Sequence, residues 1–148
     1  MRRGLRVDVR SVRALTQDDL ASLAKVPTLA GALARARAAA GDAPVTNLCV
    51  FRAFAERTLA ANASIDTTLP VVISQQEAGA TGVPVDILCF IKPDAAPDLA
   101  NVEGALLDRL TLALPAFALR AYQQGSDLGP VHGALPWLAA QDLVAAGV

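Results

Sequence analysis

The sequence has few of the side chains that usually carry chemistry. Its 148 residues include one histidine, two cysteines, one tyrosine and one tryptophan. Hydrophobic residues make up 53% and charged residues 18%, which excludes a chain that is disordered throughout. No apolar run approaches the ~18 residues that a membrane-spanning helix needs. We therefore expect a single domain, residues 1–148, with its own core and no association with a membrane.

Several recognisable sites are also missing. One histidine and two separated cysteines, Cys49 and Cys89, supply too few ligands for a metal site, so we expect none. No G-x-S-x-G turn, G-x-G-x-x-G loop or P-loop occurs. Two separated cysteines do not make a disulfide framework. The first arginines are not followed by the apolar segment that a secretory signal peptide needs. These absences favour the cytoplasm as the compartment.

Positive charge is concentrated at the N-terminus. The net charge of −1 gives no reason to expect a nucleic-acid partner. Residues 1–13 nevertheless contain Arg2, Arg3, Arg6, Arg10 and Arg13. These arginines would bind phosphates or an acidic partner, or they would keep an edge strand from pairing with other chains. We favour the edge strand.

The hydrophobic periodicity predicts the secondary structure. The expected elements are a strand around residues 5–9, a helix capped by Thr16, helices at 28–40 and from Thr46 or Asn47 to 61, strands at 71–73 and 85–91 joined by a glycine-containing hairpin, a helix at 98–114, further helix to Tyr122, and a short helix from Pro136. The strand at 85–91 is almost wholly apolar, which predicts a central strand buried on both faces. This order predicts an α/β two-layer sandwich, in which helices cover a small mixed sheet.

Three residues are candidates for a functional site. His132 lies between glycines in a loop, where it would act as a general acid or base, or would be a surface residue without a role. Cys49 lies near the start of a helix, whose dipole would lower the pKa of the thiol. Tyr122 is a second candidate for proton transfer or ligand binding. For Cys49, as for Cys89, packing in the core is the favoured role.

One stretch resembles a known family. A helix opening at Thr46 ends in Asn62-Ala63-Ser64-Ile65-Asp66, and the hairpin and the turn Lys92-Pro93-Asp94-Ala95 follow. This arrangement resembles the catalytic domain of dihydrolipoamide acyltransferases, which has the chloramphenicol-acetyltransferase fold. The likeness covers about residues 5–114 and implies a fold like half of an acyltransferase core.

The sequence departs from that family at the catalytic motif. The family's His-x-x-x-Asp-Gly motif, whose histidine is the general base, does not occur, because Gly133-Ala134-Leu135-Pro136-Trp137 follows His132. The resemblance therefore implies an acyltransferase-like subunit for assembly or for binding an acyl group or a pantetheine arm. It further implies a homo- or hetero-oligomer, since that family's active sites form between subunits, and coenzyme A or pantetheine as a ligand. The residues themselves indicate no cofactor.

Two other functions stay open. One is a small stand-alone enzyme for an apolar molecule, with His132 or Tyr122 in acid–base catalysis. The other is a structural subunit of a larger particle, in which the arginine-rich strand adds to a neighbour's sheet. Whether the chain is an enzyme is therefore undecided, although the missing motifs favour assembly or binding.

Overall fold

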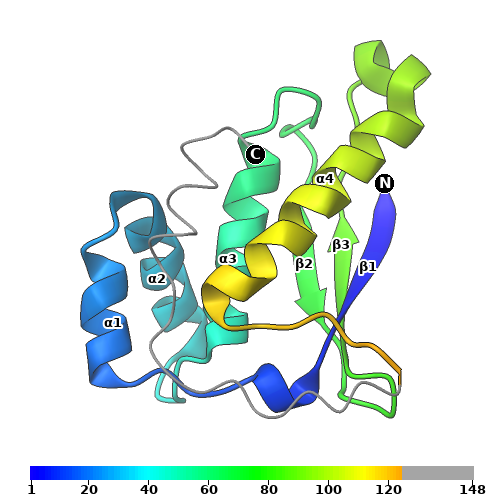
Figure 1. Cartoon of the computed structure of the whole chain (residues 1–148). Helices are drawn as coiled ribbons and strands as arrows, with labels where there is room; N and C mark the ends of the chain where they lie inside the picture. Colours follow the sequence, from blue (N-terminus) through cyan, green and yellow to red (C-terminus); the bar gives the residue numbers. More distant parts are fainter. Residues whose placement is uncertain (125–148) are drawn as a thin grey trace.

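A computed structural model describes residues 1–124, in which helices pack against one small sheet (Figure 1). Here η marks a short 3-10 helix. In chain order the elements are β1 (Arg2–Val7), η1 (Val9–Ser11), α1 (Gln17–Ala24), α2 (Pro27–Ala40), α3 (Asn47–Ala60), β2 (Val72–Gln75), β3 (Val83–Leu88), η2 (Pro93–Asp98), α4 (Leu99–Ala113) and η3 (Leu114–Phe117). His132 and the helix expected from Pro136 lie outside the described residues.

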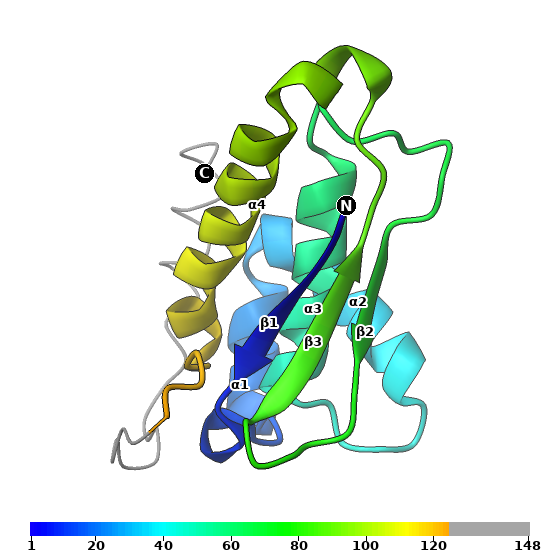
Figure 2. The same ribbon diagram turned by 90° about the vertical axis from the view of Figure 1, so that its right-hand side faces the viewer.

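The sheet has three strands in the order β1-β3-β2, and both pairs of neighbours are antiparallel. The helices of the described chain lie on one face of this sheet, which confirms the α/β two-layer sandwich (Figure 2). The expectation of a mixed sheet is wrong for these residues. Strands β1 and β2 run in the same direction, but each pairs only with β3, which the hairpin turns the opposite way.

Strand β3 is central, as its sequence predicts, but it is not buried on both faces. Val83, Val85 and Ile87 point into the core and are at most 3% exposed. Leu88, by contrast, is 39% exposed, as is Phe90 just beyond the strand at 38%. The cause is that within residues 1–124 no second layer of helices covers the outer face of the sheet.

Two threonines and a glycine set three of the helix ends. Thr16 forms a capping box with Asp19 at the start of α1, and Thr46 accepts a hydrogen bond from the N–H of Cys49 at the start of α3. Gly41 closes α2 with a φ of 57°, a conformation that favours glycine. Helix α2 begins at Pro27, one residue before the expected start at 28, because proline suits a first helical turn.

The chain leaves the helical layer after α4. Pro115 converts the end of α4 into η3, and Ala118 then takes a left-handed conformation with a φ of 54°. The helix expected through Tyr122 is therefore wrong. The backbone N–H of Tyr122 donates to the carbonyl of Arg6 instead, and Ala121 forms a bridge with Val7.

The core lies between the sheet and the helices. Phe117 packs against Phe51 and Phe54 of α3, with ring centroids 5.6 and 5.1 Å apart. Asn47 lies beside them and is fully buried. Its amide donates to the carbonyls of Ser11 and Phe117 and accepts from the N–H of Arg13. One side chain therefore connects η1, α3 and η3.

The N-terminal arginines lie on and after an edge strand, as expected. Arg3 forms an ion pair with Glu103 of α4, and Arg6 donates to the hydroxyl of Thr81 in the hairpin. Arg10 pairs with Asp8, and Arg13 pairs with Asp19. Much of this positive charge is therefore engaged within the chain. Over residues 1–124, no helix has both the length and the apolar character to cross a membrane.

Candidate functional site

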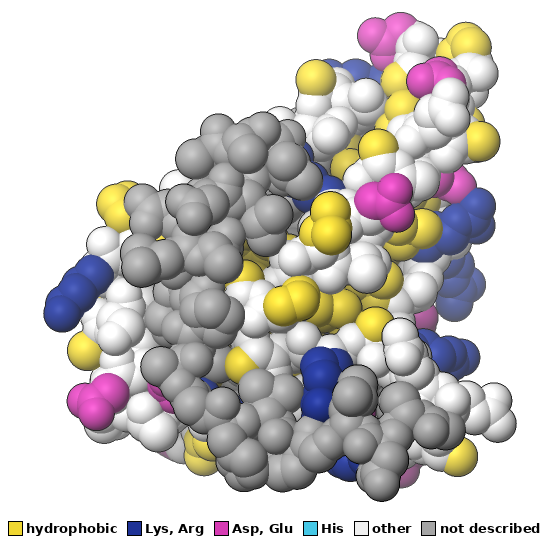
Figure 3. Space-filling model, viewed as in Figure 1, with side chains coloured by type: hydrophobic (Ala, Val, Ile, Leu, Met, Phe, Trp, Pro, Cys, Tyr) yellow, Lys and Arg dark blue, Asp and Glu magenta, His cyan; other side chains and the backbone are white. Residues whose placement is uncertain are grey.

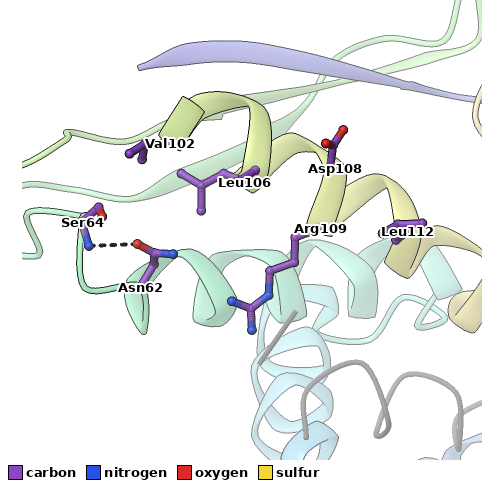
Figure 4. A pocket seen from close by; sticks show the side chains of 8 residues that line it. Asn62, Ser64, Val102, Leu106, Asp108, Arg109 and Leu112 are labelled. Atoms are coloured by element: carbon purple, nitrogen blue, oxygen red, sulfur yellow. Dashed lines mark hydrogen bonds between the residues drawn. The ribbon is translucent and has the colours of Figure 1, made fainter. Parts of the chain in front are cut away.

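A cavity of about 430 Å³ opens between α4 and the loop that follows α3 (Figure 4). Four apolar side chains spaced along one face of α4 line it: Val102, Ala105, Leu106 and Leu112. Leu106 is only 2% exposed and belongs to the core, whereas Leu112 is 58% exposed. Figure 3 shows hydrophobic side chains gathered along α4 at the surface. The volume and lining fit a small, largely apolar ligand.

The loop after α3 supplies the polar side of this cavity. The carboxamide oxygen of Asn62 accepts a hydrogen bond from the N–H of Ser64 at 2.9 Å, which fixes the turn. The carboxamide nitrogen of Asn62 and the hydroxyl of Ser64 have no partner within residues 1–124, and both residues line the cavity. They are able to hydrogen-bond a polar group of a ligand.

Arg109 provides the positive charge of the site. Its side chain extends from α4 toward α3, while that of Asp108 points the other way (Figure 4). The Nε of Arg109 is buried and lacks a hydrogen-bond partner within residues 1–124. Such an atom is costly to leave unpaired, at about 1–3 kcal/mol. A carboxylate or phosphate group entering the cavity would satisfy it.

Cys49 lines a different and smaller cavity, of about 230 Å³. This cavity lies among α2, α3 and β2, and its lining residues are Arg35, Ala36, Ala39, Cys49, Arg52, Ala53, Glu56 and Ile73. The Sγ of Cys49 lies 3.6 Å from the carbonyl oxygen of Ala36, within reach of a weak S–H hydrogen bond. The thiol therefore packs partly against α2.

The expected lowering of the pKa of Cys49 is wrong. Burial raises the pKa of this thiol above its ordinary value of 9.0, and the positive charge of Arg52 offsets only part of that effect. The backbone N–H of Cys49 itself already donates to the hydroxyl of Thr46. Cys49 is therefore a neutral thiol at pH 7. Cys89 is fully buried in the core, and burial raises its pKa as well, which confirms its packing role.

The two sequence candidates within the described residues, Cys49 and Tyr122, do not share a cavity. Tyr122 lies next to Gly82 and β1 and lines neither cavity, while Cys49 lies among α2, α3 and β2. His132 falls outside the described residues. Sequence reasoning did not single out Arg109, although it is the single positive charge in the apolar helix α4. That isolation is the signal that would have identified it.

The described residues contain no candidate metal site. Within residues 1–124, no three His, Cys, Asp or Glu side chains come together in a way that would hold a metal ion. Comparison with protein-family models, curated proteins and solved structures finds no match to this chain. The two cavities are therefore the features of the described chain that bear on its function.

Proposed function

We propose that this domain binds its ligand rather than transforming it, and that the ligand is an acyl chain or pantetheine arm with an anionic end. The observation that carries the proposal is the buried, unpartnered Nε of Arg109 beside an apolar cavity. The apolar face of α4 would take the chain, and the guanidinium would take the anion. None of the residues within 1–124 that line this cavity is a histidine or a cysteine, which favours binding over catalysis.

The resemblance noted in the sequence supports the same class of ligand. Asn62 and Ser64 belong to the Asn62-Ala63-Ser64-Ile65-Asp66 segment that resembles the acyltransferase family, and both line the cavity. A carboxamide and a hydroxyl are suitable partners for the amide groups of a pantetheine arm. The assembly role implied by the same resemblance would place this arm next to a partner subunit.

Calorimetric titration tests the proposal with three probes: hexanoate, hexanol and pantetheine, which is uncharged and tests the arm without its anionic end. Hexanoate and hexanol share an apolar chain, so any preference for hexanoate reports the contribution of Arg109. We expect hexanoate to bind about tenfold more tightly than hexanol, the size of one charge-assisted hydrogen bond. The Arg109→Gln variant should lose this preference while it binds hexanol unchanged.

Filling the cavity provides the second variant. Ala105→Phe places a ring in the cavity and should weaken binding of both six-carbon probes and of pantetheine. Ala100→Phe is the matched control, since Ala100 is exposed on the same helix and does not line the cavity. The proposal is wrong if wild-type protein binds hexanoate and hexanol equally, or if Ala105→Phe binds every probe as wild-type protein does.

A further inference from the structure

We infer that the open edge of β2 and the cavity beside it form a second binding site, which takes an extended peptide segment carrying a carboxylate side chain. The site is separate from the α4 cavity and does not depend on the function proposed for it. Three observations carry the inference: the direction of the backbone groups of β2, the absence of charge on that strand, and an arginine with an unsatisfied donor beneath it.

The hydrogen-bond register shows which groups of β2 are available. The N–H of Gln76 donates to the carbonyl of Pro84, so these two residues form a hydrogen-bonded pair. Hydrogen-bonded and non-hydrogen-bonded pairs alternate along an antiparallel ladder. Ile73 and Gln75, which pair with Ile87 and Val85, therefore direct their N–H and C=O groups away from β3. Within residues 1–124 no other strand lies on that side.

The two edges of the sheet differ in how they are protected. Strand β1 carries three exposed arginines, a common device against pairing with another chain. Strand β2 has the sequence Val-Ile-Ser-Gln, without charge or proline. With only four residues, β2 is long enough to pair with one short partner segment. A peptide fits such an edge better than the long strand of another sheet does.

The smaller cavity adjoins this edge and is positively charged. Ile73 belongs both to the edge strand β2 and to the lining of the cavity. A terminal nitrogen of Arg52 donates to the carbonyl of Ile73 at 3.4 Å, the long limit of a hydrogen bond. The Nε of Arg52 is buried and has no partner in the part of the chain that the structure describes. Arg35 is already paired with Glu56. Arg52 is therefore the guanidinium available to an incoming anion.

These features together define a mode of recognition. A peptide that extends the sheet would hydrogen-bond to Ile73 and Gln75, and alternate side chains would face the cavity. A glutamate or aspartate at such a position would pair with Arg52 and satisfy its Nε. The backbone of β2 would then provide affinity, and Arg52 would provide selectivity for an acidic side chain.

Fluorescence polarisation on the full chain tests this site with two labelled peptides of about six residues, the usual length of a strand. Both alternate valine and threonine, and they differ only in a central glutamate or glutamine. We expect the glutamate peptide to bind about tenfold more tightly. Its binding should also slow hydrogen exchange at the amides of Ile73 and Gln75.

Substitutions separate the two parts of the site. Gln75→Pro removes an N–H that faces the open edge and leaves the ladder with β3 intact, so it should weaken both peptides. Gln75→Ala keeps this N–H and should bind as wild-type protein does. Arg52→Gln should remove the preference for glutamate, whereas Arg37→Gln, on the exposed surface of α2, should retain it.

The inference fails if neither peptide binds, or if both bind equally to wild-type protein. It also fails if Gln75→Pro binds both peptides as tightly as Gln75→Ala does. Circular dichroism of each variant shows whether it is folded, and the preference between the two peptides is measured within a single variant, so a loss of stability does not imitate the expected result.

Discussion

At the scale of single residues, Asn47 is the most heavily bonded side chain of the interior. Besides the bonds to Ser11, Phe117 and Arg13, its carboxamide oxygen accepts from the N–H of Leu48. Asn47 is fully buried, so water is not available to replace these bonds. Its role is structural, because it holds the segment after β1 and the segment after α4 against the start of α3.

Replacing Asn47 by alanine should therefore destabilise the fold strongly. The substitution removes the four hydrogen bonds of the Asn47 carboxamide, and we expect a loss of about 3 kcal/mol. Chemical denaturation measures it. Asn101→Ala is the control, since Asn101 is exposed and bonds only Asp98, and it should change stability by about 0.5 kcal/mol or less. Equal stability of the two variants would contradict this account.

At the scale of elements, the β2–β3 hairpin depends on one of its two glycines. Gly82 has a φ of 81°, and a Cβ built on it would lie 2.4 Å from the carbonyl oxygen of Val7. A Cβ on Gly79 would meet nothing within 4 Å. The two glycines form a bridge with each other, yet only one of them is required by its surroundings.

This difference predicts opposite results for the same substitution. Gly82→Ala should destabilise the protein by roughly 2–4 kcal/mol, because it combines a strained backbone with a collision against β1. Gly79→Ala should leave stability within about 0.5 kcal/mol of wild type. Thermal unfolding of both variants measures the difference. A Gly82→Ala protein that unfolds at the wild-type temperature would show that β1 does not pack as described.

The elements were largely predictable because local signals define them. Thr16, Gly41 and Thr46 mark helix ends by side-chain capping or by a left-handed backbone, and these effects act within a few residues. The segment from Ala118 to Tyr122 was not predictable, since its conformation follows from hydrogen bonds to β1, far away in the sequence. The open outer face of β3 was missed for a similar reason, because an apolar run does not reveal whether a second layer exists.

The candidate site was less predictable than the fold. A cavity depends on which side chains of different elements meet, and sequence patterns report only one element at a time. Asn62 and Ser64 were noticed through a resemblance, but Arg109 lies on α4, and only the structure brings it to the same cavity. The thiol of Cys49 was placed on the correct helix, yet its pKa follows from packing against α2.

At the scale of the whole molecule, two buried carboxylates make stability depend on pH. Hydrogen bonds from Arg10 lower the pKa of Asp8 below its ordinary value of 3.8 and outweigh the effect of burial. Burial alone would raise the pKa of Asp19, but hydrogen bonds from Arg13 and Thr16 outweigh it and lower the pKa. A depressed folded-state pKa contributes stability that is present above the unfolded-state value and is lost as pH falls through the folded-state value.

We therefore expect the free energy of unfolding to be level near neutral pH and to decrease as pH falls below about 4. Asp8→Asn should be less stable at pH 7, and its stability should fall less steeply in acid. Urea denaturation at a series of pH values measures both effects. Asp42→Asn is the control, because Asp42 is exposed and its stability curve should follow that of wild type. Parallel acid curves for Asp8→Asn and wild type would rule out this linkage.

The strand order β1-β3-β2 also has a consequence for the sequence of folding events. The pairs α2–α3 and β2–β3 are neighbours in the chain and need only short loops to close. Strand β1, however, precedes its partner β3 by more than half of the described chain, so their contact closes a long loop and should form late. Until this contact forms, β1 has no strand partner. Its exposed arginines then disfavour pairing of this segment with other unfolded chains.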